Sequence, residues 1–342
     1  MGVAFKDIIP GKEITIEHLN GKILVVDSFN LLYQFLSSIR ARDGSLLMDS
    51  KGNVTSHLVG LFSRVTNFMS AGIKLVFVFD GKAPDLKQKE REKRKSMKIE
   101  AQKEYEKAKE EENVDLMKKY ASRTSILNEQ MIEDAKKLIS YLGLPVVQAP
   151  SEGEAQAAHI VKKENFFGVV SQDYDSLLYA TPNLIRNLSI AGKRKIADKL
   201  SYITVNPEII NITDVLNEIG LDQDQLIVMA ILIGTDYNNG GIKGIGPKNA
   251  LKLVKEYKRN FDKLFEDVKW KDFFDFDWKD VFNLFKNMPV TDNYKIQWNN
   301  ISKEKLKEFL LEHDFSEERI NSTLEKLEKH QESKKQRSLA DF

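Results

Sequence analysis

The 342-residue sequence contains no cysteine. Disulfide bonds, thiol catalysis and cysteine-based zinc fingers are therefore excluded. The sequence also lacks an apolar stretch long enough for a transmembrane helix. Its first residues, MGVAFKDIIP, lack the basic-then-apolar pattern of a signal peptide. These absences predict a protein without a membrane partner, in a cytosolic or nuclear setting.

Net charge is also nearly absent, because 52 Lys and Arg residues balance 51 Asp and Glu residues. The two signs are unevenly placed along the chain. Residues 87–98 read KQKEREKRKSMK and are strongly basic, whereas acidic residues gather elsewhere, partly at the ends of apolar runs. A balanced total can therefore conceal a basic groove beside an acidic site.

Three short apolar runs each lead into acidic residues. Because the runs have no polar face, they suit strands that are buried on both sides, as in a parallel sheet. Helical patterns lie between them, which predicts an α/β fold with a parallel-type central sheet and helices on both faces. The runs and their acids are residues 23–26 with Asp27, residues 74–79 with Asp80, and residues 167–171 with Asp173 and Asp175.

The rest of the chain is mostly helical in pattern. Residues 84–120 are rich in Lys and Glu and contain no Gly, which predicts a long solvated helix that projects from the core. After about residue 206 we expect mainly helices, with a buried helix at 224–235 and two helices within 303–330. The polar residues from Gln331 onward predict a flexible tail.

The acidic residues after the three runs should meet at one edge of the sheet. In an open α/β sheet, ligands bind beyond the carboxyl ends of the strands, where Asp27, Asp80, Asp173 and Asp175 lie. Any one of these residues taken alone is better explained as a turn or helix-capping residue. Three acidic strand ends favour a site instead, because clustered like charges are costly without a cation.

Three further acids belong to this group on weaker grounds. Glu152 and Glu154 lie in the sequence PSEGEA, where Ser151 and Glu154 also have the spacing of a capping box. A cap needs only one of the two glutamates, however, and Gly153 between them is poor helix material. Asp236 follows the buried helix, where an ordinary loop residue is the alternative.

Seven carboxylates with this placement suit hard divalent cations. Mg²⁺ prefers oxygen ligands and keeps several waters, so the seven can serve two ions partly through water. Two such ions, about 3.5–4 Å apart, can activate a water and stabilise the leaving oxygen of a phosphodiester. The five histidines are scattered and do not indicate zinc.

Six motifs occur in the order VVDSFNLLYQF, VFVFDGKAPDLK, PSEGEAQAA, SQDYDSLL, IGTDYN and GIKGIGPKNA. Together they closely resemble flap endonucleases of the XPG-like 5′ nuclease family, over nearly the whole chain, and the MGV start is similar to the archaeal branch. The resemblance implies two-metal-ion hydrolysis of 5′ flaps at junctions of single- and double-stranded DNA. It also implies roles in replication (Okazaki fragment processing) and repair, and 5′–3′ exonuclease activity.

The same resemblance assigns roles to particular residues. The seven carboxylates match the family's metal ligands without a departure from its pattern. Lys87 and Arg94 match the residues that grip the scissile phosphate. Tyr33 matches an aromatic that stacks on a substrate base, although Leu32 and Phe35 beside it at helix spacing would also suit core packing. The other matches to DNA contacts are Gly2, Thr55, Arg64, Gly244, Gly246 and Lys248, of which Thr55 is equally placed to cap a helix.

Two segments carry expectations of their own. Pro247 suits the first turn of a helix, whose N-terminus can hold a phosphate without reading bases. The family has a helix-two-turn-helix element here, often with a bound K⁺ ion.

The end of the chain, residues 336–342, resembles a sliding-clamp (PCNA) binding box in Gln336, Leu339 and Phe342. Such a box has two adjacent aromatics, and this chain stops at the first, which implies a shortened box or a low clamp affinity.

The resemblance implies one nuclease domain, residues 1–330, followed by a flexible tail, residues 331–342. We expect a monomer in the cytoplasm, associated with the nucleoid if archaeal, or in the nucleus if eukaryotic. Two alternatives stay open: a related 5′ exonuclease, bubble, Holliday-junction or RNA nuclease, and a non-catalytic DNA-binding scaffold. The expected parts of the domain are 1–83, a helical arch at 84–127, residues 128–237 that complete the metal site, and residues 238–330 with the helix-two-turn-helix.

Overall fold

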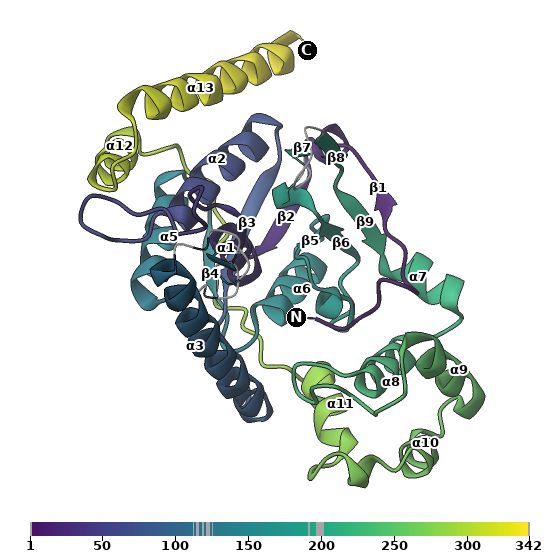
Figure 1. The fold of residues 1–342 in the computed structure, drawn as a ribbon. Coiled ribbons are helices and arrows are strands. Elements are labelled where there is room, and N and C mark those ends of the chain that lie inside the picture. The colour runs from purple at the N-terminus through teal and green to yellow at the C-terminus, as the bar shows by residue number, and fades with distance from the viewer. Residues whose placement is uncertain are drawn as a thin grey trace.

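The computed structural model describes residues 2–111, 113, 116–117, 120, 124, 126–190, 192–195 and 202–340, with the backbone alone for 89, 91, 93, 192–195, 202–204 and 330–340. Within these residues a seven-stranded sheet has the order β1-β9-β6-β5-β2-β3-β4 (Figure 1). A separate hairpin joins β7 (Gly192–Lys195) and β8 (Tyr202–Val205). The strands of the large sheet are β1 (Lys12–Glu13), β2 (Ile23–Asp27), β3 (Lys74–Phe79), β4 (Val146–Gln148), β5 (Gly168–Val170), β6 (Asn183–Arg186) and β9 (Glu208–Asn211).

The centre of the sheet is parallel, as the apolar runs predict. Strand β2 pairs in parallel with both β3 and β5, and the parallel ladder continues to β4 on one side and β6 on the other. Strands β9 and β1 add an antiparallel edge. The sheet is therefore mixed. The structure after residue 206 is mainly helical, as expected, and the short strand β9 is an addition.

Both faces of the central strands are buried. In β2, Leu24 and Val26 pack into a cluster with α1 and α2, whereas Val25 between them packs against α6. Since neither face meets water, these strands have no polar alternation, which is why they read as continuous apolar runs. The helices that cover the sheet are α1 (Ser28–Ser38), α2 (Ser56–Ser70) and α5 (Glu129–Tyr141) on one face and α6 (Gly153–Lys163) on the other.

The long basic segment is helix α3 (Gln88–Glu110), preceded by one 3₁₀ turn, η2 (Asp85–Lys87), and it extends away from the sheet (Figure 1). A helical region forms a second core around the buried helix α8 (Gln223–Ile233). Its other members are α7 (Ile212–Ile219), α9 (Pro247–Tyr257), α10 (Phe261–Asp267), η5 (Trp270–Asp272) and α11 (Trp278–Lys286).

The chain ends in two helices, α12 (Lys303–Glu312) and α13 (Glu317–Ala340), which lie beside α2 and α5 (Figure 1). Helix α13 includes the backbone of residues 331–340, which belong to the tail that the sequence predicts to be flexible. Glu, Lys, Gln and Arg dominate this segment and have high helix propensities, which accounts for its helical backbone.

Helix α2 corrects a smaller expectation. Thr55 occupies its N-cap position, but no side-chain cap hydrogen bond forms there. The hydroxyl of Ser56 instead accepts a hydrogen bond from the backbone N–H of Leu47, at 2.9 Å. The two residues therefore tie the start of α2 to the preceding loop, since the Thr55 N–H also donates to the Leu47 carbonyl.

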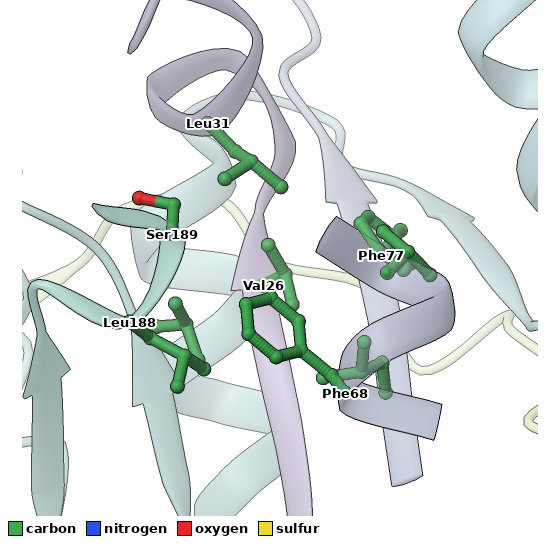
Figure 2. Close-up of a pocket in the computed structure, with 9 residues that line it drawn as sticks. Val26, Leu31, Phe68, Phe77, Leu188 and Ser189 are labelled. Atoms are coloured by element: carbon green, nitrogen blue, oxygen red, sulfur yellow. The ribbon is translucent and has the colours of Figure 1, made fainter. Parts of the chain in front are cut away.

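A small internal void lies between β2, β3 and the helices above them (Figure 2). Its volume is about 10 Å³, and its walls are apolar apart from Ser189. A void of this size is at the lower limit for one water, and an apolar lining keeps such a space dry. It is packing space within the core. Its lining residues are Val26, Leu31, Val65, Phe68, Leu75, Phe77, Val170, Leu188 and Ser189.

Among the residues that the structure describes, no helix is both long and apolar enough to cross a membrane.

Candidate active site

The strand ends place their acids along one edge of the sheet. Asp27 is the last residue of β2 and also the N-cap of α1, where its carboxylate accepts from the Asn30 N–H at 3.2 Å. Asp80 directly follows β3, and Asp173 follows β5 at the start of the 3₁₀ turn η3 (Tyr174–Leu177), which contains Asp175. The parallel register aligns these strand ends, so the predicted convergence is present.

The start of helix α6 brings two glutamates to the same edge. Glu152 is the N-cap residue, but it makes no side-chain cap hydrogen bond. The capping-box alternative is wrong, because the Ser151 hydroxyl donates to the Lys82 carbonyl at 3.0 Å. The Glu154 carboxylate instead accepts from the hydroxyls of Ser171 and Ser176, at 2.9 and 3.1 Å. Glu154 is therefore turned toward the segment that carries the aspartates.

A direct contact joins α6 to the end of β3. The backbone N–H of Gly153 donates to the Asp80 carboxylate at 2.7 Å. A Cβ atom on residue 153 would lie 2.4 Å from that same oxygen. The absence of a side chain at Gly153 therefore allows Asp80 to approach the helix N-terminus, where the N–H groups favour an anion.

The carboxylates lie close enough to disturb one another's ionisation. Burial raises the pKa of Asp27 well above its usual value, and repulsion from Asp80 and Asp173 adds to this. Burial and the charge of Asp175 likewise raise the pKa of Glu154. For Asp175, burial and the charge of Asp173 raise the pKa to about 7. Groups that destabilise each other's charge in this way are arranged for a cationic partner.

Two cations from the base of α3 lie against the other side of the group. The Lys87 ammonium is 2.5 Å from Glu152 and 3.3 Å from Asp236, and the Arg94 guanidinium contacts Asp236. Burial opposes the charge of Lys87, but Glu152 and Asp236 outweigh it and raise the lysine's pKa. Burial would raise the pKa of Asp236, yet Lys87 and Arg94 outweigh it and lower that pKa. Lys87 and Arg94 thus lie against the carboxylates, and their role at the scissile phosphate stays a prediction.

The N-terminal segment reaches the same site. The Gly2 N–H donates to Asp173 at 3.0 Å, and the Val3 N–H donates to Asp175 at 2.7 Å. A Cβ atom on residue 2 would lie 2.7 Å from the Asp173 Cβ and 2.8 Å from an Asp175 oxygen. Gly2 therefore packs directly against two of the carboxylates, and a larger residue would displace them.

The donor set fits hard divalent cations. All seven candidate ligands offer carboxylate oxygens, and burial together with repulsion from neighbouring carboxylates raises the pKa values of Asp27, Glu154 and Asp175. Within the described part of the chain, no three acidic or histidine side chains already lie in an arrangement that holds a metal ion directly. Because Mg²⁺ retains several of its waters, contacts through water would suit this wider spacing.

The remaining predicted residues lie away from the carboxylates. Tyr33 on α1 is 37% exposed, so the core-packing alternative is wrong, and the Lys98 ammonium lies 4.4 Å from its ring centre. Arg64 is half-buried on α2. Gly244, Gly246 and Lys248 are exposed at the N-terminus of α9, which Pro247 begins. In Figure 1, α9 and α2 lie on opposite sides of the region that holds α6 and the N-terminus.

The predicted clamp-binding residues lie partly outside the residues that the structure describes. Phe342 lies outside the residues that the structure describes, as do the side chains of Gln336 and Leu339.

The sequence argument missed several residues that hold the carboxylates. Asn30 donates from its side-chain amide to Asp173 at 3.0 Å, and its carbonyl oxygen accepts from the Gln172 N–H at 3.1 Å. Ser171 and Ser176 hold Glu154 in the contacts above. The only sequence signal for these polar residues is their position inside the motifs beside the acids.

Comparisons with known proteins show the family of the chain. Residues 3–101 match the XPG N-terminal domain, and residues 143–236 match the XPG I-region. The chain is 50% identical over 343 residues to the flap endonuclease 1 of Pyrococcus furiosus, an alignment that covers 100% of this chain and 99% of that protein. The chain belongs to the flap endonuclease 1 family. The resemblance in the motifs is confirmed.

Solved structures of flap endonuclease relatives have the same fold. The flap endonuclease-1 from Methanococcus jannaschii matches with a TM-score of 0.75 and 40% identity, covering 97% of this chain and 100% of that one. The catalytic core of Rad2 in complex with DNA substrate matches with a TM-score of 0.68 at 22% identity, covering 96% of this chain and 100% of that one. The second likeness is one of fold. The predicted fold class is confirmed, with the antiparallel edge as an addition.

Proposed function

We propose that the protein is a divalent-metal-dependent, structure-specific nuclease that cleaves 5′ flaps at junctions of single- and double-stranded DNA. The observation that carries this proposal is the contact of Lys87 and Arg94 with a convergent group of carboxylates. The full-length flap endonuclease 1 relatives support the same activity. By this proposal the protein acts in DNA replication, including Okazaki fragment processing, and in repair, and it also has 5′–3′ exonuclease activity.

The proposed chemistry is hydrolysis of one phosphodiester bond, which leaves a 5′ phosphate and a 3′ hydroxyl. Two Mg²⁺ ions, held by the seven carboxylates partly through water, would activate the attacking water and neutralise the leaving oxygen. Lys87 and Arg94, whose positive charges pair with Glu152 and Asp236, would then bind the scissile phosphate. Charge stabilisation of this kind is effective because the groups are positioned before the reaction. The seven carboxylates are Asp27, Asp80, Glu152, Glu154, Asp173, Asp175 and Asp236.

Substrate selection would rest on the shape and the backbone of the DNA. The exposed ring of Tyr33 offers a stacking surface for one base, which is insensitive to sequence. The N-terminus of α9 offers backbone N–H groups to a phosphate, with Gly244, Gly246 and Lys248 around it. Thr55 and Arg64 on α2 would contact the 3′ end of the substrate, on the opposite side of the site (Figure 1). The projecting helix α3 would form one side of the arch for the 5′ strand.

We also propose a K⁺ ion at the turn before α9. Gly244 has a φ of +87°, a backbone conformation that L side chains rarely adopt, and it is exposed, so the carbonyls of this turn can face a ligand. Flap-DNA affinity should then be higher in potassium chloride than in lithium chloride at equal ionic strength. Equal affinity in both salts would remove the ion from the proposal.

The sliding clamp is the proposed protein partner, bound through residues 336–342. The protein itself is proposed to be a monomer, with the nuclease domain in residues 1–330, and to act in the cytoplasm at the nucleoid, or in the nucleus if eukaryotic. Calorimetric titration with a PCNA-type trimer should show binding that Leu339→Ala with Phe342→Ala abolishes and Ser338→Ala preserves. Unchanged binding by the double variant would place the contact elsewhere.

The activity itself is tested with a labelled double-flap DNA beside single-stranded, blunt-duplex and bubble DNA, each in magnesium and in EDTA. Magnesium-dependent cutting at the base of the flap, with poor cutting of the other substrates, is the expected result. Equal cutting of all four would retain a metal nuclease and discard the flap specificity. Tight binding without cutting would favour a DNA-binding scaffold.

A further inference from the structure

We propose that Glu90 is a positioning residue that holds the Arg94 guanidinium in place for the scissile phosphate and pins the base of helix α3 to the loop after Asp236. This inference rests on the proposed function, since it assumes that Arg94 acts on the substrate. Glu90 lies in the basic segment 87–98, where the sequence predicts a solvated helix face.

Glu90 differs from the other glutamates of its helix in its burial. It is only 8% exposed, whereas the others are exposed. A buried carboxylate is unfavourable unless charged or polar groups pair with it. Its burial on an otherwise solvated helix therefore indicates a specific contact. The exposed glutamates of α3 are Glu92, Glu100, Glu104, Glu106 and Glu110.

Both oxygens of the Glu90 carboxylate are engaged by groups of the site. One oxygen accepts a hydrogen bond from Arg94 Nε at 2.8 Å, and the other accepts from the side-chain amide of Asn239. Asn239 is three residues beyond Asp236, which the Arg94 guanidinium contacts through a different nitrogen. Glu90, Arg94 and Asp236 are therefore joined in a row, and Asn239 anchors its outer end.

The row fixes the direction of the guanidinium. Because this group is planar and its donors form a rigid fork, contacts at Nε and at a terminal nitrogen leave it little rotational freedom. An arginine side chain otherwise has many rotamers, and ordering it on the way to the transition state costs free energy. Glu90 would remove that cost beforehand, which lowers the barrier of the chemical step rather than strengthening the binding of DNA.

The surroundings of Glu90 support a role beside the substrate. Glu90, Asp236 and Asn239 line one open hollow of about 330 Å³. An isolated ion pair at spacing i,i+4 on a helix contributes only about 0.3–0.5 kcal/mol. An ordinary pair of this kind would lie on the solvated side of α3. In the Glu90–Arg94 pair, by contrast, the carboxylate is buried and the guanidinium contacts Asp236, a candidate metal ligand.

The substitution Glu90→Gln tests the positioning of Arg94 without changing the size of the side chain at residue 90. The new side chain keeps the size of the old one, but an amide has only one oxygen, so it can accept from Arg94 or from Asn239 and turns a donor toward the other. Glu92→Gln is the matched control, because Glu92 is exposed on the same helix and contacts Gln88, at 3.2 Å.

The experiment measures single-turnover cleavage of the double-flap DNA, with the dissociation constant measured separately in Ca²⁺, for the wild type and for Glu90→Gln, Glu92→Gln, Arg94→Ala and the double variant of residues 90 and 94. We expect Glu90→Gln to slow cleavage by about 10- to 100-fold and to change binding by less than about threefold. Glu92→Gln should be within about twofold of the wild type. The double variant should match Arg94→Ala alone, because Glu90 has nothing left to orient.

Either of two results would overturn the proposal. One is a Glu90→Gln rate within twofold of the wild type, and the other is a double variant whose loss is the product of the two single losses. Unfolding temperatures of all variants, measured alongside, ensure that each is folded during the assay. If the wild type does not cut the flap at all, the proposed function fails. If the wild type cuts and Glu90→Gln cuts equally well, only the role of Glu90 fails.

Discussion

The side-chain amide of Asn30 donates to the carboxylate of Asp173 at 3.0 Å, across 143 positions of sequence. Asn30 lies in the first turn of α1, three residues after Asp27, so one short segment supplies a carboxylate and also orients another. Residues that orient metal ligands in this way affect metal affinity even though they do not touch the ion. A substitution of Asn30 therefore tests the site without altering any of its seven acids.

Replacement of Asn30 by Ala should lower flap cleavage by about 10- to 100-fold at limiting magnesium. The reason is that Asp173 loses a donor that fixes its carboxylate. The measurement is the magnesium concentration that gives half-maximal cleavage, which should rise. Asn217→Ala, at an exposed position of α7, serves as the control and should titrate like the wild type. A magnesium titration unchanged by Asn30→Ala would show that the contact does not support the ligands.

Asp175→Asn should abolish cleavage in magnesium, with a loss of more than about 1,000-fold, because several kcal/mol of charge stabilisation disappear. The same variant should unfold at a higher temperature in EDTA, by about 2–4 °C for each kcal/mol of repulsion that is removed. Burial, together with the charge of Asp173, raises the pKa of Asp175 to about 7, so part of that shift reflects the repulsion. Asp262→Asn, which alters an exposed aspartate of α10, should change neither property. Full cleavage by Asp175→Asn would sink the metal assignment.

Enlarging Gly2 should reduce cleavage in proportion to the size of the new side chain. A Cβ atom there meets Asp173 and Asp175 at 2.7 and 2.8 Å, so Gly2→Ala must shift at least one carboxylate. A displacement near 1 Å can cost about 100-fold in rate, and Gly2→Val should lose more than Gly2→Ala. Single-turnover cleavage measures this, with Lys6→Ala, at an exposed position nearby, as the control. Equal rates for Gly2→Val and the wild type would exclude a close approach of the N-terminus.

His57 on α2 should make the protein less stable as the pH falls. It is buried, and burial lowers its pKa to about 4, although Asp134 opposes this and His313 adds to it. Because the unfolded chain has the usual histidine pKa of about 6.5, it takes up the proton first between pH 6.5 and 4. The stability present above pH 6.5 is therefore lost as the pH falls through that window, by about 2 kcal/mol between pH 7 and 5.

The measurement is the free energy of unfolding by urea at pH 7, 6 and 5, for the wild type and for His57→Leu, which removes the titrating group. Between pH 7 and pH 5, the unfolding free energy of the wild type should fall by about 2 kcal/mol more than that of His57→Leu. His18→Gln, at an exposed position, should leave the pH dependence of the wild type intact. Parallel curves for His57→Leu and the wild type would show that His57 does not titrate in this window.

The sequence predicts the parts of the site that depend on chain direction alone. Strands β2, β3 and β5 are apolar on both faces, so their bounds are visible as continuous runs, and parallel strands must end at one edge of a sheet. Asp27, Asp80, Asp173 and Asp175 follow from that geometry without knowledge of any side-chain contact. Glu152, Glu154 and Asp236 were predicted on weaker grounds, because each had a local explanation as a cap or a loop residue.

Contacts between distant segments are what the sequence does not show. Ser151 and Glu154 have the spacing of a capping box, yet each forms its hydrogen bonds with other segments, Ser151 with Lys82 and Glu154 with Ser171 and Ser176. Strand β9 was missed for a similar reason, since a four-residue strand at an antiparallel edge gains its stability from pairing with β6 and not from a pattern of its own. Glu90 appears solvated in sequence because its partner Asn239 is 149 positions away.

The contact of Gly2 with Asp173 joins residues 171 positions apart, and Lys87 reaches Asp236 across a comparable distance in the chain. During synthesis the first of these residues leaves the ribosome long before its partners exist. A nascent chain shorter than 236 residues therefore carries Lys87 and Arg94 without Asp236, with which both pair. By the proposed function, products that terminate before residue 236 would lack one of the seven carboxylates, so nuclease activity would arise only after that residue has been synthesised and has met its partners near the start of the chain.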